Sequence, residues 1–374
     1  MAMKIKRVFV GMSGGVDSSV AAALLNKQGY EVIGVHLKCY NVDGCAAQDA
    51  EDARRVAETI GIPFYTFDFE KEYKEKVVEY MIGGYKKGIT PNPDVMCNKE
   101  IKFGLFYEKA MELGADFVAT GHYVLKIENS CLPVGMGKLK IARDRAKDQS
   151  YFLWTLRSEQ LAHCLFPIGE YTKPQVRKLA ARFGLHNAQK KDSQGICFLG
   201  QVSLPDFLKK YIKPKKGAIL DIHGNEIGEH HGAHLYTIGQ RHLGIKNQEL
   251  GVKNKPNQKP FYVADKDVKK NVIVIAEGDK HPALYKKEVA LTNINFLMPP
   301  VANHNSALTR QSTIPVFARV RYRQPLAKAK LKMKNEKISL EFNKPVKFVA
   351  AGQSVVFYNK KGVMLGGGVI KSAK

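Results

Sequence analysis

One short string constrains this chain more than any other feature: Ser-Gly-Gly-Val-Asp-Ser at positions 13–18. An apolar run at 8–12 precedes it, and a run of valine, alanine and leucine at 20–25 follows it. Adjacent glycines let a backbone curl closely around an anion, and the start of a helix adds a positive dipole end. The order strand, glycine-rich loop and helix therefore predicts a phosphate-binding loop in an α/β fold.

This loop differs from the Walker loop at one position. A Walker loop carries a lysine directly after its last glycine, where it neutralises the β- and γ-phosphates. Here Asp17 stands in the loop instead, and a carboxylate suits a magnesium-bound pyrophosphate. The string resembles the pyrophosphatase loop of the N-type ATP pyrophosphatases. That resemblance implies that ATP is cleaved to AMP and pyrophosphate while a carbonyl oxygen is adenylated, with Mg²⁺ expected, and it leaves the nucleophile open.

The charge balance favours a polyanionic partner. The 374 residues include 59 lysines and arginines against 35 aspartates and glutamates, which gives a formal net charge of +24. A positive surface binds nucleic acid through counterion release, although a lysine-rich proteome gives the same balance. The sequence contains neither a run of about eighteen apolar residues nor a signal-peptide pattern. We therefore expect a cytoplasmic protein that does not enter a membrane.

The pattern along the chain predicts three units. Strand-like and helical runs alternate over residues 1–125, which indicates a parallel sheet flanked by helices. After residue 216, short alternating runs predict a small barrel or sandwich, and the clearest is a hairpin over 327–342 with one basic face. The expected domains are listed by residue: a catalytic domain at 1–165, a small helical domain with a second cysteine loop at 166–216, and a β-rich barrel at 217–374.

Six cysteines are too few and too irregular for a disulfide scaffold, and no C-x-x-C pair indicates zinc, so metal ligands stay unassigned. Cys97 follows a proline-framed loop, and we expect a nearby helix start and Lys99 to lower its pKa. Asp94 is close enough in sequence to exchange a proton with it. Cys197 lies in a second polar loop behind two lysines. Two such thiols suggest sulfur transfer by thiol exchange, whereas a buried structural role is the alternative for each.

Several separate motifs are together similar to the family of bacterial tRNA-specific 2-thiouridylases. The motifs are listed by position: 11–18, 92–103, 120–123, 147–153, 192–198, 237–241, 321–324 and 345–368. Because they occur in order along nearly the whole chain, chance agreement is negligible. The fold that the resemblance implies is a HUP-like ATP pyrophosphatase domain, then a small helical domain and a C-terminal β-barrel.

The resemblance also implies a reaction. ATP adenylates the 2-oxygen of the wobble uridine in a tRNA, and a persulfide on Cys197, filled by an upstream sulfur-carrier protein, supplies the sulfur. Cys97 is the implied nucleophile that releases this sulfur, through a transient disulfide with Cys197, while Asp94 moves protons. The implied protein is a monomer. No role follows for the other four cysteines, Cys39, Cys45, Cys131 and Cys164.

Site residues follow from the same motifs. The residues expected at ATP are Gly11, Met12, Ser13, Gly14, Gly15, Val16, Asp17, Ser18, Leu37 and Gly121. The residues expected at the target base are Asn92, Pro93 and Asp94. The residues expected to contact tRNA elsewhere are His122, Lys147, Asp148, Gln149, Arg321, Tyr322 and Gln353. His122 and Tyr322 suit structural roles equally well.

Two other functions stay open at this point. An amide-forming or lysidine-forming synthetase of the same superfamily adenylates and then aminates, and it has no use for Cys97 or Cys197. A redox-regulated RNA-binding protein uses the two thiols as a regulatory disulfide and binds tRNA without releasing pyrophosphate. The first alternative is an enzyme and the second is not, so a pyrophosphate assay separates them.

Overall fold

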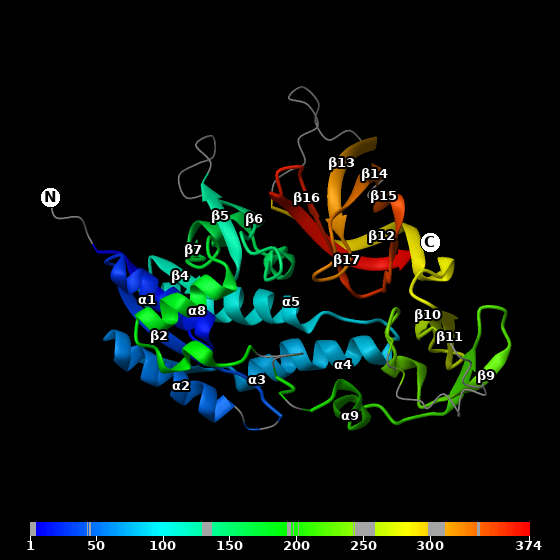
Figure 1. Cartoon of the computed structure of the whole chain (residues 1–374), viewed down its shortest axis with the longest axis horizontal. Coiled ribbons are helices and arrows are strands. Elements are labelled where there is room, and N and C mark those ends of the chain that lie inside the picture. The colour runs from blue at the N-terminus through cyan, green and yellow to red at the C-terminus, as the bar shows by residue number, and fades with distance from the viewer. Residues whose placement is uncertain are drawn as a thin grey trace.

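The computed structural model describes residues 5–42, 44, 46–128, 137–192, 196, 198–200, 202–241, 243, 259–297, 311–334 and 337–374. An α/β sheet with its helices forms one end of the molecule, and two β units stand at the other end (Figure 1). The fold class predicted from the sequence is confirmed, and the choice between barrel and sandwich resolves as a closed barrel. Among the described residues no helix is both long and apolar enough to cross a bilayer.

The α/β sheet is parallel, in the order β3-β2-β1-β4-β7. Its strands are β1 (Arg7–Gly11), β2 (Glu31–Lys38), β3 (Phe64–Asp68), β4 (Phe117–Thr120) and β7 (Cys164–Leu165). From β1 the chain adds β2 and β3 on one side of the sheet, and it then adds β4 and β7 on the other side. At such a switch point a crevice opens beyond the carboxyl ends of the two central strands, here β1 and β4. The phosphate loop leaves β1 at this point.

Two apolar layers cover the sheet, as the period of two along β1 requires. Val8 and Val10 point into one layer, whereas Phe9 points into the other. The first layer is built on α1 (Val16–Lys27), α2 (Ala46–Ile60) and α8 (Lys173–Arg182). Helix α8 lies in the segment expected to be a separate small domain, and it packs into the same layer as α1. The domain limits themselves stay a prediction.

The second layer contains two long helical rods that run from the sheet toward the β units (Figure 1). One rod joins α3 (Glu70–Tyr73), a π-helical segment η1 (Lys74–Val78) and α4 (Glu79–Lys86). The other joins α5 (Pro93–Cys97), a π-helical segment η2 (Asn98–Leu105) and α6 (Phe106–Glu112). Asn92 caps the second rod because its Oδ1 accepts from the Val95 N–H at 3.2 Å, and Pro93 occupies the first turn.

The remaining elements of the first half connect these layers to the β units. They are β5 (Val124–Glu128), β6 (Gly137–Ile141), η3 (Ser150–Leu153), α7 (Ser158–Ala162), η4 (His186–Gln189) and α9 (Leu204–Lys209). Strands β5 and β6 pair as an antiparallel hairpin. Segment η3 packs against β6, and its Tyr151 hydroxyl donates to the Ser354 carbonyl of the barrel at 2.8 Å, so it links the α/β part to the barrel.

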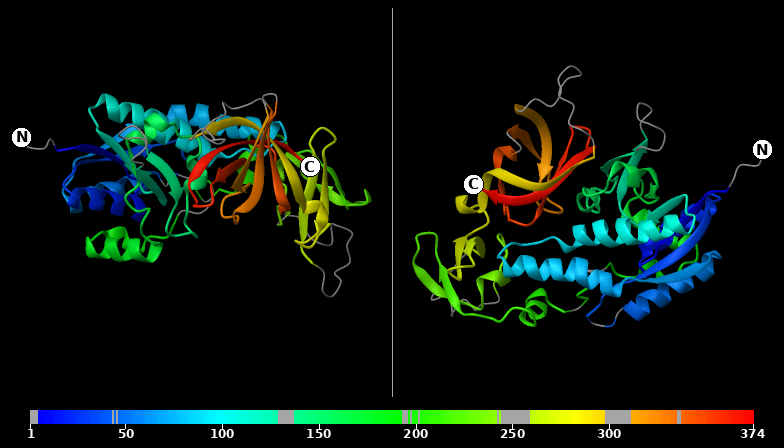
Figure 2. Two further views of the ribbon diagram at one scale, coloured as in Figure 1. Left: turned by 90° about the horizontal axis from the view of Figure 1, so that it is seen from above. Right: turned by 180° about the vertical axis from the view of Figure 1, so that it is seen from behind.

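The segment expected as one β-rich domain contains two β units (Figure 2). The first is a sheet of β8 (Gly217–Leu220), β9 (Glu226–His230), β10 (Phe261–Asp267) and β11 (Val272–Glu277), with short helices η5 (Ala233–Leu235) and η6 (Pro282–Leu284). The second is a closed barrel of β12 (Tyr285–Phe296), β13 (Gln311–Arg319), β14 (Ala327–Lys334), β15 (Lys337–Lys347), β16 (Ser354–Tyr358) and β17 (Met364–Ala373). Strands β14 and β15 pair as the expected hairpin, and its turn lies outside the described residues.

Candidate functional site

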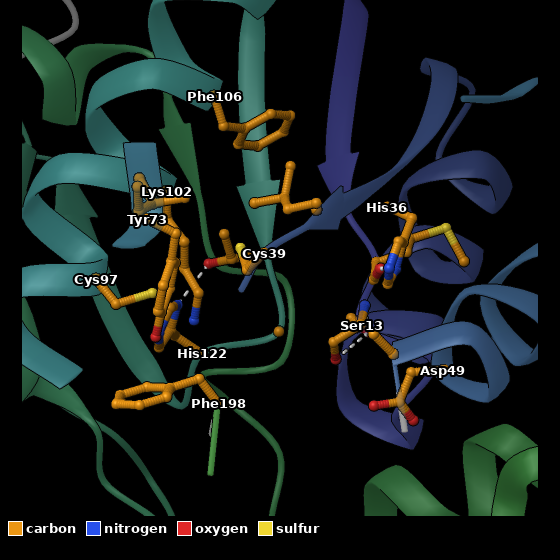
Figure 3. Close-up of a pocket in the computed structure, with 18 of the residues that line it drawn as sticks. Ser13, His36, Cys39, Asp49, Tyr73, Cys97, Lys102, Phe106, His122 and Phe198 are labelled. Atoms are coloured by element: carbon orange, nitrogen blue, oxygen red, sulfur yellow. Dashed lines mark hydrogen bonds between the residues drawn. The ribbon is translucent and has the colours of Figure 1, made fainter. Parts of the chain in front are cut away.

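Two connected pockets occupy the crevice beyond the strand ends. The first has a volume of about 390 Å³ and receives the ends of β1, β2 and β4. The second has a volume of about 590 Å³ and opens toward η3 and the barrel. Figure 3 shows Ser13 and Asp49 on one side of the first pocket, facing Cys97, His122 and Phe198 on the other. The phosphate loop and the predicted nucleophile therefore face a common space.

The phosphate loop has the backbone geometry of an anion site. Gly14 has a φ of +70°, and a Cβ there would lie 2.3 Å from the Asp49 carbonyl oxygen. Gly121 lets the end of β4 touch the start of α1, because a Cβ there would lie 2.5 Å from the Ser18 nitrogen. The first N–H groups of α1 have no partner within the helix, so they are available to phosphate oxygens.

Nearly all of the residues expected at ATP come together in this space. The members that line one or both pockets are Gly11, Met12, Ser13, Gly15, Val16, Asp17, Ser18, Leu37 and Gly121. Gly14 is the exception, and it packs against the backbone of Asp49. Inside the loop, the Ser18 hydroxyl donates to the Gly15 carbonyl at 3.2 Å and accepts from the Ser13 N–H at 3.2 Å. These bonds fix the conformation of the loop.

Cys97 lies one turn further into its helix than the sequence suggested. The helix begins at Pro93, so Cys97 ends α5 and does not lie at a helix N-terminus. Lys99, expected to activate the thiol, instead pairs with Glu100 at 2.8 Å and lines neither of the two pockets. Lys102 lines both. A π-helix aligns residues five apart, so η2 places Lys102 on the side of Cys97 and turns Lys99 away.

Burial shifts the pKa of two titratable groups near Cys97. Burial raises the pKa of Asp94, and the charge of Lys102 partly offsets this effect. Burial also holds the pKa of His122 well below its usual value, and Lys102 adds to the shift, so this ring is neutral. The His122 Nδ1 lies 2.7 Å from the Thr120 hydroxyl, which satisfies that nitrogen. Asp94 is thus the group near Cys97 best suited to stay protonated at a pH above its ordinary pKa.

Cys197 itself lies outside the described residues, and so do Cys45 and Cys131. The residue after Cys197 is described: Phe198 lines the first pocket together with Cys97. Its ring packs against Tyr73, with 5.7 Å between ring centroids, and its carbonyl accepts from the Val42 N–H at 3.1 Å. The second cysteine motif therefore reaches the pocket at a position directly beside its cysteine.

Of the residues expected at tRNA, Asn92 and Pro93 form the buried start of α5 and line neither of the two pockets. The others fall into two groups. The members that line the second pocket are Asp94, His122, Lys147, Gln149 and Tyr322. Phe152 also lines it, and its ring lies 4.5 Å from that of Tyr322 between centroids. The two rings form an aromatic wall opposite the phosphate loop.

The second group lines neither of the two pockets, and its side chains bind other parts of the protein. Asp148 is 2% exposed and forms an ion pair with Arg319 of the barrel. Gln353 donates to the carbonyls of Thr90 and Pro91, at 3.0 and 3.1 Å. Arg321 donates to the Ile238 carbonyl. Each of these bonds joins segments that are distant in the sequence, and those at Asp148 and Gln353 join the barrel to the α/β domain.

The sequence did not predict a cluster of charged residues beside the phosphate loop, formed by Asp17, Lys173 and Asp192. Lys173 is 7% exposed and lies between Asp17 and Asp192. The Tyr123 hydroxyl donates to Asp17 at 2.8 Å. In the sequence Lys173 begins an ordinary helix behind Thr172 and before Pro174, and nothing in that pattern pointed to the loop. The absent Walker lysine was the one available signal.

Sequence families match the chain over nearly its whole length. The family described as "tRNA methyl transferase HUP domain" matches residues 6–201. "tRNA methyl transferase PRC-barrel domain" matches 205–277, and "Aminomethyltransferase beta-barrel domain" matches 286–370. These three matches follow the observed α/β sheet, the β8–β11 sheet and the closed barrel.

Individual relatives are similar at full length. The tRNA-specific 2-thiouridylase of Geobacillus kaustophilus is 46% identical, over 98% of this chain and 96% of that protein. The tRNA-specific 2-thiouridylase of Streptococcus agalactiae is 44% identical, over 98% of this chain and 95% of that protein. Among solved structures, the U34-tRNA thiolase NcsA of Methanococcus maripaludis is 21% identical over 55% of this chain and 67% of that chain, with a TM-score of 0.35. That structural likeness is too low to add to the sequence matches.

Proposed function

The chain belongs to the family of tRNA-specific 2-thiouridylases, and from this premise we propose how its site carries out the reaction. The protein is an ATP-using sulfurtransferase that acts on tRNA and replaces the 2-oxygen of a uridine with sulfur. The wobble uridine is the target, and Cys197 carries the sulfur as a persulfide. One observation supports this assignment above the others: the phosphate loop and Cys97 line the same pocket.

Adenylation comes first because an oxide ion is a very poor leaving group. Once the 2-oxygen is bonded to the α-phosphate of ATP, it departs as part of AMP. The N–H groups at the start of α1 and the hydroxyls of Ser13 and Ser18 stabilise the charge that develops on pyrophosphate. They are arranged before the substrate enters, so little reorganisation is needed.

Asp17 is the residue that would hold Mg²⁺. Magnesium is commonly bound by one or two carboxylates together with substrate phosphates, and it supplies Lewis-acid stabilisation of the pyrophosphate charge when bound. The described residues contain no group of three or more histidine, cysteine or acidic side chains that could hold a metal alone. A single loop carboxylate beside an anion site fits a metal that arrives with ATP.

Sulfur transfer then uses the two thiols. The terminal sulfur of the Cys197 persulfide attacks C2 of the uridine, and AMP leaves with the 2-oxygen. The Cys97 thiolate attacks Sγ of Cys197, the persulfide S–S bond breaks, and the thiocarbonyl keeps the transferred sulfur. A Cys97–Cys197 disulfide remains, and an external thiol reduces it. Asp94, whose pKa is raised by burial, takes up and returns the proton at Cys97.

The tRNA contacts divide in the same way as the observed side chains. We assign the target base to Asn92, Pro93 and Asp94. We assign direct RNA contact to the pocket-lining residues His122, Lys147, Gln149 and Tyr322. Asp148, Arg321 and Gln353 act as positioning residues, because they line neither pocket and their side chains bind protein groups. An anticodon base must leave its stack to reach this pocket, as is usual for enzymes that modify a base.

Further parts of the proposal concern the protein as a whole. It works as a cytoplasmic monomer and receives sulfur from an upstream persulfide carrier. The catalytic domain comprises residues 1–165, a small segment at 166–216 carries the second cysteine loop, and the β-rich part at 217–374 holds tRNA. The net charge of +24 supports a large contact with RNA.

The test combines purified protein, ATP, Mg²⁺, a persulfide donor and tRNA with an unmodified wobble uridine. We expect pyrophosphate release together with a nucleoside whose mass shows sulfur in place of oxygen. Release of pyrophosphate with nitrogen incorporation would favour the synthetase alternative. Binding of tRNA without any pyrophosphate release would favour the RNA-binding alternative.

A further inference from the structure

Lys173 brings a buried ammonium group to the phosphate loop, which lacks the lysine of a Walker loop. It enters from α8, far along the chain, and its Nζ lies 2.7 and 2.8 Å from the two carboxylate oxygens of Asp17. A lysine is rarely this buried unless it is paired. The side chain lines the second pocket beside Ser13, Gly15 and Asp17 of the loop, so it can reach a phosphate held there.

The same ammonium group holds the segment that leads to the second cysteine motif. Its Nζ lies 2.8 Å from Asp192, five residues before Cys197. Lys147 also pairs with Asp192, and Arg177 does so at 3.2 Å. Although burial raises the pKa of Asp192, hydrogen bonds from Lys147 and Lys173 lower it to about 2, so the carboxylate is ionised at neutral pH.

A second set of bonds docks this segment on the phosphate loop itself. The Asn187 amide donates to the Gly14 carbonyl at 3.0 Å and to the Ser19 hydroxyl at 2.9 Å. Lys190 forms an ion pair with Asp49 at 2.7 Å, and the backbone of Asp49 packs against Gly14. Residues 187–192 therefore lie directly on the element that binds phosphate, and their ion pairs compete for the charges that a phosphate would use.

We propose that Lys173 binds the pyrophosphate portion of ATP by exchanging its bond to Asp192 for a bond to phosphate, so that an occupied loop loosens the anchor of residues 187–192. Asp192 is a positioning residue in this scheme: it holds Lys173 ready and competes with the incoming anion. The inference rests on the proposed function for the identity of the ligand. Linkage then requires the reverse effect, because whatever weakens the anchor must tighten anion binding.

Binding of magnesium pyrophosphate, measured by calorimetry without tRNA or sulfur, tests the exchange. Lys173→Met should weaken binding at least about tenfold, since a charge-assisted hydrogen bond is lost. Asp192→Asn should tighten binding about threefold or more, because a competing charge is removed. Lys178→Met, an exposed lysine on the same helix with no ion pair described for it, is the matched control and should change nothing.

The double variant separates the exchange from a general charge effect. If Asp192 acts through Lys173, Asp192→Asn should give little gain in a Lys173→Met background. An equal gain in both backgrounds, or no loss in Lys173→Met, would overturn the proposal. Lys173→Arg keeps the charge and should retain most of the affinity, which guards against misfolding of the methionine variant. Failure of tRNA thiolation would leave this binding result unaffected.

Hydrogen exchange of the backbone amides at 187–192 tests the coupling from the other side. In the wild-type protein, magnesium pyrophosphate should speed exchange in this segment, because Asp192 loses one of its three cations. In Lys173→Met the same addition should have no such effect. Unchanged or slower exchange in the wild-type protein would overturn the coupling.

Discussion

The two segments that bring the cysteine motifs to the pocket are held by different forces. Cys97 lies on a capped helical rod whose neighbours Ile101, Phe103 and Phe106 are at most 1% exposed. The approach to Cys197 is held instead by Asp192 and Lys190, which are half-buried and bound by ion pairs. Apolar packing is insensitive to salt and fixes one geometry, whereas partly exposed ion pairs are screened and exchange partners. The helical rod that carries Cys97 is therefore a fixed segment, whereas the segment of residues 187–192 responds to anions.

The largest expected effect comes from removing the thiol on the fixed segment. Cys97→Ser should lower the rate of 2-thiouridine formation by about three orders of magnitude or more, because the serine hydroxyl cannot break the persulfide bond. Pyrophosphate release in the presence of tRNA should persist, since adenylation does not use this thiol. Cys164→Ser, on the other buried and described cysteine outside both pockets, is the control. Full thiolation by Cys97→Ser would place the chemistry elsewhere.

The buried ion pair of Asp148 and Arg319 provides a comparison with the partly exposed ion pairs at Asp192. Asp148 and Arg319 are 2% and 6% exposed, and Ser150 and Tyr358 hydrogen bond to the same pair. Removing one partner leaves an uncompensated buried charge, so Asp148→Ala should destabilise the protein by about 3–5 kcal/mol in denaturant unfolding. It should also weaken the hold on Asp192, because Lys147 is the neighbouring residue. Recovery of stability in an Asp148→Ala, Arg319→Met double variant would confirm the pair, and a small loss in the single variant would contradict it.

The sequence predicts much of the phosphate loop and of the segment around Cys97, but it does not predict the contacts that hold residues 187–192. The glycine pair, the strand before it and the helix after it are local patterns, and the structure contains β1, the loop and α1 in the predicted order. Asn92 and Pro93 form a local helix start. Their sequence equally predicts a loop, because prolines also frame loops. The π-helical turn that brings Lys102 to Cys97 has no local signal, since it depends on packing. Lys173 and Asp192 meet through tertiary contacts, which no spacing along the chain reveals.

Asp94, the proposed proton carrier beside Cys97, gives the next effect, and the sign of this effect on stability follows from burial. The pKa of Asp94 is raised, so the folded state holds its proton more tightly than the unfolded chain does. The ionised carboxylate therefore costs stability, and the cost grows as pH rises above the ordinary value of 3.8 through the raised pKa. Asp94→Asn should match the wild-type melting temperature below about pH 4 and exceed it at neutral pH. The rate of thiolation should fall about a hundredfold, because the amide cannot carry the proton. A lower melting temperature at neutral pH would contradict the burial argument.

The smallest effect should come from loosening the fixed segment without touching its thiol. Asn92→Ala removes the cap that accepts from Val95, and it should cost about 1 kcal/mol of unfolding free energy. Asn92→Ser restores a capping oxygen, so it should recover most of that stability. His281 accepts from the Ala283 N–H at 3.2 Å and caps a short helix far along the chain, so His281→Ala is a matched control for cap loss. If the cap matters by fixing Cys97, thiolation should fall in Asn92→Ala and be unchanged in His281→Ala. If Asn92→Ser recovers stability and leaves thiolation low, the amide contacts the uridine directly, and the cap is the lesser of its two roles.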